Sequence, residues 1–440
     1  MVSRDTLALR RMAESRAELV RFSRFFNNPK VTPAEILASA AARTAEAAAG
    51  RHVLLIEDST QINFQAKAGR KRALGRIGNG AQLGLFIHPA LAVDAADETV
   101  LGIAAAQIWR RFHRKAADYK SQPTELKESQ RWIATLLDAR QALGEAALVT
   151  GIADREGDIY ELFARVPDAR THLLVRCAQN RRLGEGGLLF ERLAAFPEAC
   201  RVSLALPARP GQPARTATLV VRFGQISLRK PEHGADRRDP AQISLAAIEV
   251  CEIDPPAGVK PIHWRLLTTH AVSSAEDALS MIELYRRRWI VEQLFRTLKS
   301  QALDIEQSFV EDGAALERLA AAALVAATTT LQLVQGRGEA GRALPASRVF
   351  SPTEVETLQL LVPQLEGKTL KQKNPHPVHT LAWAAWVIAR LGGWMGYASE
   401  RPPGPITMFH GLQRFHAMAQ GYALAKHHFS PQALYDVCKH

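Results

Sequence analysis

The 440-residue sequence is poor in cysteine and has no long uninterrupted apolar run. No two of its four cysteines have the spacing of a zinc site or a redox pair: Cys177, Cys200, Cys251 and Cys438. A disulfide or zinc framework is therefore excluded, and a reducing cytoplasm suits the chain. Residues 1–21 carry charges throughout and lack the apolar core of a signal peptide. The most apolar stretch, 319–333, is shorter than the ~20 residues that span a bilayer, so we expect a buried helix and no membrane partner.

The charge balance is strongly basic. The chain has 56 Lys and Arg against 44 Asp and Glu, a net charge of +12 and an isoelectric point near 9.8. Such an excess favours a polyanionic partner, and with a membrane disfavoured the expected partner is nucleic acid. A basic protein without such a partner is the alternative, because net charge governs association rather than fold.

The order of patterns along the chain predicts an α/β protein of two or three domains. Residues 1–48 are helical in pattern, with a break at Asn28-Pro29 and a helix start at Thr32. Strands and helices alternate over 49–345, and the pattern is nearly all β from about 200 to 270. Residues 346–440 are again helical in pattern.

Two apolar runs that predict buried strands end in acidic residues. Residues 53–56 lead to Asp58, and residues 147–153 lead to Asp154. In open α/β sheets, ligand sites form beyond the carboxyl ends of strands, and a buried Asp needs a cation or a hydrogen-bonding partner. The alternative for each Asp is a cap on the following turn.

A predicted long helix, 274–303, supplies a third carboxylate. On an ideal helix, Tyr285, Arg288, Glu292 and Lys299 share one narrow stripe at the border of the apolar face. The alternative is a solvated face with weak pairs such as Arg288 with Glu292. Three carboxylates suit hard divalent cations, and two such ions stabilise the attacking and leaving oxygens of a phosphodiester displacement.

These residues carry a family resemblance. The spacing Tyr285-x2-Arg288-x3-Glu292-x6-Lys299 resembles the Tyr-Arg-Glu-Lys signature of bacterial insertion-sequence transposases of the transposon-five type. Asp58 within Ile-Glu-Asp-Ser-Thr, and Asp154 within Asp-Arg-Glu-Gly-Asp-Ile, resemble the two aspartate motifs of the same class. The resemblance runs from about residue 20 to about residue 425.

The resemblance implies a ribonuclease-H-like catalytic domain over 49–345, with the β-rich insertion at about 183–270. It also implies helical flanking domains, a DNA-binding one over 1–48 and a dimerisation domain over 346–440. The implied activity is cut-and-paste transposition of double-stranded DNA by a synaptic homodimer, using Mg²⁺ or Mn²⁺ as two ions and a hairpin intermediate. The resemblance implies that Asp58, Asp154 and Glu292 are the metal ligands and that Tyr285, Arg288 and Lys299 contact the end phosphates. It also implies that Arg176 contacts a flipped nucleotide and that Trp264 stacks on the base of that nucleotide. Arg24 matches a position that contacts DNA.

Relative to that class, roughly the first forty residues are missing, within the region that reads the transposon end. One alternative is therefore a truncated DNA-binding inhibitor, and a second is a ribonuclease-H-like nuclease acting on other nucleic acid. The expected location is the cytoplasm, on the nucleoid when DNA is bound. In the C-terminal domain, apolar residues at helical spacing could be interface anchors or core: Trp383, Trp386, Val387, Leu391 and Trp394.

Overall fold

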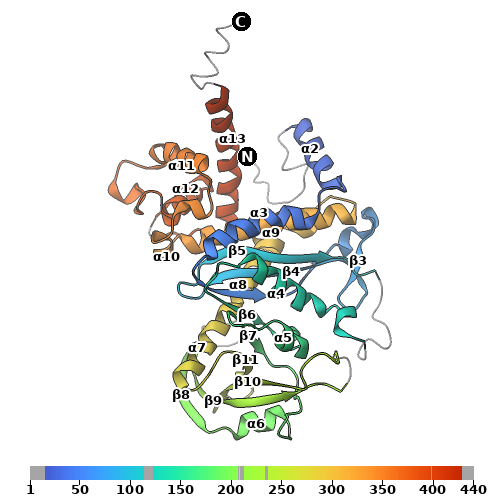
Figure 1. Cartoon of the computed structure of the whole chain (residues 1–440). Helices are drawn as coiled ribbons and strands as arrows, with labels where there is room; N and C mark the ends of the chain where they lie inside the picture. Colours follow the sequence, from blue (N-terminus) through green and yellow to red (C-terminus); the bar gives the residue numbers. More distant parts are fainter. Residues whose placement is uncertain are drawn as a thin grey trace.

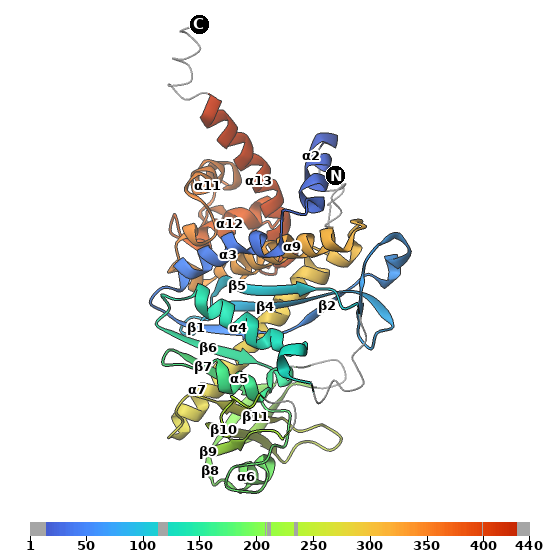
Figure 2. The ribbon, with the colours of Figure 1, turned by 45° about the vertical axis from the view of Figure 1, so that its right-hand side comes forward.

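A computed structural model describes residues 15–112, 122–206, 208, 213–232, 236–397 and 399–428. Within these ranges, one large mixed sheet forms the centre of the protein, with helices on both faces (Figures 1 and 2). A smaller group of helices from the C-terminal part packs on the end of the long helix α9 (Gly313–Gly336), which itself lies on the sheet. The predicted α/β class is confirmed.

Two helices open the described chain, α2 (Arg16–Asn27) and α3 (Pro33–Ala48), so the predicted break between them is confirmed. The hydroxyl of Thr32 accepts the amide of Glu35, and the Glu35 carboxylate accepts the amide of Thr32. This reciprocal cap fixes where α3 begins because it satisfies amides that have no partner inside the helix.

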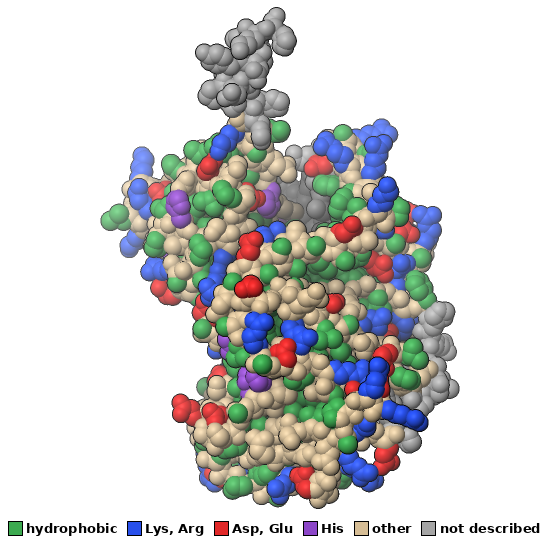
Figure 3. Space-filling view, viewed as in Figure 1, with side chains coloured by type: hydrophobic (Ala, Val, Ile, Leu, Met, Phe, Trp, Pro, Cys, Tyr) green, Lys and Arg blue, Asp and Glu red, His purple; other side chains and the backbone are tan. Residues whose placement is uncertain are grey.

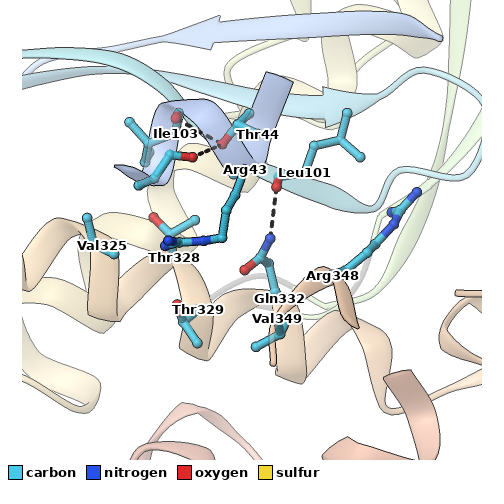
Figure 4. A pocket seen from close by; sticks show the side chains of 12 residues that line it. Arg43, Thr44, Leu101, Ile103, Val325, Thr328, Thr329, Gln332, Arg348 and Val349 are labelled. Carbon is cyan, nitrogen blue, oxygen red and sulfur yellow. Dashed lines mark hydrogen bonds between the residues drawn. The ribbon is translucent and has the colours of Figure 1, made fainter. Parts of the chain in front are cut away.

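Helix α3 lies against strand β5 (Val100–Trp109) and helix α9 (Gly313–Gly336). The Thr44 hydroxyl donates to the carbonyls of Ala40 and Ile103, and Gln332 of α9 donates to the carbonyl of Leu101 (Figure 4). A Cβ at Gly102 would lie 2.1 Å from Thr44 Oγ1, so only glycine permits this close approach. The cavity left between these elements, about 30 Å³, has room for little more than one water.

The described strands form one sheet in the order β2-β4-β1-β6-β7-β11-β10-β9-β8, with β3 and β5 also paired to β4. Strands β1, β6 and β7 are parallel to one another, and β4 is antiparallel to β1. The bounds are β1 His52–Glu57, β2 Thr60–Asn63, β3 Gly75–Ile77, β4 Gln82–Asp94, β6 Leu148–Ala153, β7 Thr171–Arg176, β8 Glu198–Leu206, β9 Arg215–Arg229, β10 Gln242–Ile253 and β11 His263–Thr268.

The β-rich stretch extends the central sheet. Strand β11 pairs with β7 over Leu266–Thr268, and β10, β9 and β8 follow outward by antiparallel pairing. Its strands therefore belong to the same sheet as β1 and β6, to which they are joined through β7, and the lower part of the molecule in Figure 1 is continuous with the upper.

Helices bury both faces of the sheet. One face packs on α7 (Ala275–Arg286), α8 (Ile290–Arg296) and α9. The other packs on α4 (Gln130–Ala142), α5 (Tyr160–Arg165) and α6 (Leu189–Ala195). By length and composition α9 could cross a bilayer, but 67% of its apolar window is buried inside the protein. The predicted buried helix at this position is confirmed.

The predicted continuous helix 274–303 is wrong in one respect. A 3-10 turn at Arg287–Trp289 separates α7 from α8, and a π-helical turn at Thr297–Gln301 ends the segment. Both irregular turns lie at the cationic residues of the signature, and π-turns inside helices are frequent at functional sites. The segment therefore departs from one ideal helix at both of these turns.

The C-terminal helices have a core of their own. Helices α10 (Glu339–Arg342), α11 (Pro352–Leu365), α12 (Leu381–Leu391) and α13 (Pro405–His428) pack together and onto the end of α9. Trp383 and Trp386 are buried within this core, so they are core residues and not exposed interface anchors. The far end of α13 extends beyond the body of the protein (Figure 1), and Met418 and Leu424 on it are exposed.

Candidate active site

Asp58 and Asp154 come together at one edge of the sheet. Strands β1 and β6 are parallel and pair Ile56 with Ile152, so both chains reach this edge in register, and each aspartate follows two residues later. Each Asp also caps its own turn, because Asp58 Oδ1 accepts the Ser59 amide and Asp154 Oδ1 accepts the Glu156 amide, both at 2.8 Å. Capping therefore accounts for one oxygen of each carboxylate.

Arg288 joins the third carboxylate to the first. Its guanidinium donates to Asp58 Oδ2 at 3.0 Å and to Glu292 Oε1 at 3.1 Å, and its side chain is only 9% exposed. The weak helical pair expected of Arg288 and Glu292 is thus one half of a buried bridge between α8 and β1. The structure brings Asp58, Asp154 and Glu292 around a single arginine.

The cluster concentrates negative charge. Burial, followed by the charge of Asp154, raises the pKa of Asp58 to about 6, while Arg288 acts in the opposite direction. In the described residues, no group of three or more His, Cys, Asp or Glu side chains has metal-binding geometry. Arg288 holds the carboxylates of Asp58 and Glu292. The repulsion between Asp58 and Asp154 would be reduced by a cation placed between them.

Tyr285 and Arg176 lie beside the same arginine. Tyr285 is buried, and burial raises the pKa of its phenol, although the charges of Arg288 and Arg176 oppose this shift. Arg176 ends β7, donates to the carbonyl of His263, and has its pKa lowered by burial. A sequence-predicted phenol and two guanidinium groups thus converge from α7, β7 and the turn between α7 and α8.

A cavity of about 610 Å³ opens next to this group. Trp264 lines it from β11, and its ring meets the ring of Tyr285 edge to face with centroids 6.0 Å apart. Arg176 and the 51%-exposed Trp289 also line it, and Arg288 stacks over Trp289 at 5.0 Å. The cavity therefore joins aromatic rings to cationic groups, as nucleotide sites do.

Two further predicted residues differ in position. Lys299 lies in the π-helical turn, where burial lowers its pKa and the charges of Glu306 and Asp58 raise it, so it is near the carboxylates. Arg24 is exposed in the last turn of α2, which packs on α9. The structure places Arg24 outside the carboxylate cluster.

A buried polar chain lies directly behind Asp58. His88 of β4 and Glu57 of β1 are both fully buried, with His88 Nε2 3.4 Å from Glu57 Oε1. The other ring nitrogen, Nδ1, lies 2.9 Å from the Ser59 hydroxyl. Burial raises the pKa of Glu57 well above its usual range and lowers the pKa of His88 to about 3.

The sequence interpretation missed Trp289, His88 and Glu57. Trp289 directly follows Arg288, and an aromatic residue beside a phosphate-binding signature is a signal that could have been used. His88 had no such signal, because antiparallel pairing of β4 with β1 is what brings it back to Glu57.

Residues 56–329 match the protein family described as Transposase DDE domain, and the match covers more than half of the sequence. The chain belongs to this family. The matched range contains Asp58, Asp154 and Glu292.

Among solved structures, the chain is similar to one described as "Cryo-EM structure of piggyBac transposase synaptic complex with hairpin DNA (SNHP)". The sequence identity is 11% and the TM-score is 0.33, over 64% of this chain. The similarity spans 47% of the length of that chain.

Proposed function

We propose that this chain is a DNA transposase that cuts and joins DNA by metal-dependent phosphoryl transfer at Asp58, Asp154 and Glu292. The observation that carries the proposal is the bridge from Arg288 to Asp58 and Glu292, with Asp154 at the end of the neighbouring parallel strand. Membership of the Transposase DDE domain family supports it.

The three carboxylates suit Mg²⁺ or Mn²⁺, because both ions prefer hard oxygen ligands. The raised pKa of Asp58 supports this, since burial and the charge of Asp154 disfavour its ionised form and a bound cation would offset both. Two bound ions would activate the attacking oxygen and stabilise the leaving oxygen of the phosphodiester. Asp58, Asp154 and Glu292 are the residues that would hold them.

The surrounding residues suit the rest of the task. Arg288 and Lys299 supply positive charge beside the carboxylates, where the non-bridging oxygens of a phosphate would lie. Tyr285 lies beside Arg176 and Arg288, and in this proposal the three side chains act together on the DNA backbone. Lys and Arg side chains also gather over α2 (Figure 3), in keeping with a DNA partner and a contact by Arg24.

The sheet supports a ribonuclease-H-like catalytic domain. Its five-strand part runs β5-β4-β1-β6-β7, with β4 antiparallel to β1 and with β1, β6 and β7 parallel. In this proposal β1 and β6, the first and fourth of these strands along the chain, lead to the two aspartates. Strands β8 to β11 are an insertion before the helix with Glu292. The segments 1–48 and 346–440, whose described residues include helices α2, α3 and α11 to α13, would then be the flanking DNA-binding and dimerisation domains.

The cavity beside Trp264 suits an extruded nucleotide, as hairpin formation in cut-and-paste transposition would require. An aromatic face recovers ~1–3 kcal/mol of stacking per base, and Arg176 at its rim supplies a charge for the adjoining phosphate. Two chains would act together in a synaptic complex with transposon ends and target DNA.

The test is strand cleavage of DNA that carries the inverted repeats flanking the gene, with Mg²⁺ or Mn²⁺. Asp58→Asn, Asp154→Asn and Glu292→Gln should each lower the rate by about 10²–10³-fold or more, because each removes a charge that the neighbours cannot replace. Glu283→Gln is the matched control, since Glu283 is exposed on α7 and pairs only locally with Arg286. Cleavage by Asp58→Asn at the parent rate would refute the assignment.

A further inference from the structure

A buried row of polar side chains contacts the residues on either side of Asp58, just after strand β1. These side chains have no role in the proposed reaction. This polar chain runs from Glu57 through His88 to the Ser59 hydroxyl, and links the residues before and after Asp58 to a different strand. Glu57 and His88 are fully buried, and they lie on the α4 side of the sheet, where Trp132 packs edge-on to His88 at 4.6 Å.

Serine, histidine and carboxylate in this order would suit an activated nucleophile, but the surroundings do not. The base that activates a serine must be able to take up a proton, and here burial lowers the pKa of the His88 imidazole to about 3. Neither carboxyl oxygen of Glu57 has a hydrogen bond of ordinary geometry among the described residues. Burying a carboxyl group without a hydrogen-bond partner costs free energy of folding, so the polar chain is expected to serve a structural purpose.

The geometry of Ser59 gives that purpose. Its amide donates to Asp58 Oδ1 at 2.8 Å, and its hydroxyl lies 2.9 Å from His88 Nδ1. Holding the hydroxyl fixes the Ser59 peptide, and the peptide in turn fixes the orientation of the Asp58 carboxylate. The Oδ2 atom then faces Arg288 and Glu292.

We propose that His88, buttressed by Glu57 and acting through Ser59, is a positioning residue that sets the orientation of the Asp58 carboxylate. The effect of His88 on catalysis rests on the proposed function, whereas its contact with Ser59 does not. In this arrangement the His88 ring lies between Glu57 and Ser59, with Nε2 3.4 Å from Glu57 Oε1 and Nδ1 2.9 Å from the Ser59 hydroxyl.

The first measurement is residue-level hydrogen exchange of the Ser59 amide in the full-length, metal-free protein. His88→Ala and Ser59→Ala should each speed exchange at position 59 by about 5–10-fold, the loss expected for one supporting hydrogen bond. His88→Asn should restore most of the protection, because an Asn amide can take the place of Nδ1 beside the Ser59 hydroxyl. Glu57→Gln should keep it, because the Gln side chain has nearly the same shape and still packs against the His88 ring.

The matched control is His172→Ala. His172 is also a histidine of the central sheet, but it lies at the start of β7, stacked on His270 with ring centroids 4.2 Å apart. It should leave Ser59 exchange unchanged. Ser59→Ala removes a single oxygen and keeps the test open should His88→Ala fail to fold. Parent-like exchange at position 59 in Ser59→Ala or in a folded His88→Ala, or an equal loss in His172→Ala, would overturn the proposal.

The second measurement is Mn²⁺ affinity by electron paramagnetic resonance of the free ion. His88→Ala should weaken binding by about 10–100-fold, the usual effect of removing a group that orients a metal ligand, with recovery in His88→Asn. If the parent shows no Mn²⁺ binding that depends on Asp58, the proposed function fails, while the exchange result still decides the positioning role. Unchanged Mn²⁺ affinity in His88→Ala beside a binding parent would overturn its effect on the site.

Discussion

Asp58 and Asp154 lie side by side because the parallel ladder of β1 and β6 pairs Ile56 with Ile152, two residues before each aspartate. Neither aspartate needs a long loop to reach the other, so the rigidity of the sheet is passed directly to the carboxylates. Glu292 comes from a helix on one face of the sheet, and Arg288 fixes its distance from Asp58. The site therefore has two components with different origins, a ladder and a salt bridge.

Asp58 should destabilise the metal-free protein at alkaline pH. Its pKa is raised from 3.8 to about 6 in the fold, so the ionised form costs at most about 3 kcal/mol above pH 6, and the cost disappears below pH 3.8. With EDTA present, Asp58→Asn should therefore raise the free energy of unfolding at pH 8 and should not at pH 4. Denaturant melts at both pH values test this, with the exposed Asp138→Asn on α4 as control. A pH-independent difference would contradict the assignment.

Arg288 should matter more for stability than a helical surface arginine. Arg288→Ala leaves Asp58 and Glu292 without their shared cation, and breaking a buried ion pair costs about 3–5 kcal/mol. Arg288→Lys should recover only part of this, because an ammonium group lacks the planar fork that reaches both carboxylates. Thermal melting of metal-free protein gives the comparison. The control, Arg286→Ala, breaks only an exposed pair with Glu283 and should change stability by less than about 1 kcal/mol.

Trp264 should be needed for stacking and not for folding. A gapped or hairpin DNA end with 2-aminopurine at the extruded position should lose fluorescence on binding to the parent, and Trp264→Ala should abolish this quenching. Affinity for the same DNA should fall about 5–100-fold, the equivalent of one lost stacking contact. Trp394→Ala, beyond the end of α12, is the control and should quench as the parent does. If Trp289→Ala loses the quenching and Trp264→Ala retains it, the base stacks on the neighbouring ring instead.

Pairing of two chains on DNA should depend on the exposed side of α13. Met418→Asp and Leu424→Asp place charges on apolar surface without touching the C-terminal core, because these residues are 45% and 62% exposed. Sedimentation with DNA ends should then show one-subunit complexes in place of two-subunit ones. Leu370→Asp is the control, since Leu370 is 88% exposed in the connector before α12. Two-subunit complexes that persist in both α13 variants would move the predicted interface elsewhere.

Much of the fold could be predicted from local patterns. The apolar run at 53–56, the capping residues at Thr32 and Glu35, and the β-rich stretch after 198 each formed the predicted element, because each depends on neighbours in sequence. The interruption at Arg287–Trp289 could not be predicted, because it arises where α7 and α8 meet the sheet. Trp383 and Trp386 show the same limit, since helical spacing alone does not distinguish a core face from an interface.

The sequence by itself determined the chemistry of the site. It contains three carboxylates at the ends of strands or on a helix, cations at signature spacing and an excess of positive charge, and these properties belong to residue types and their order. Tertiary structure alone decided which atoms meet. Arg288 bridges Asp58 and Glu292, which are 234 positions apart in the sequence, and His88 reaches Ser59 only through the antiparallel ladder of β4. Contacts between residues far apart in sequence depend on sheet order and helix packing, which the cooperative burial of the whole core fixes.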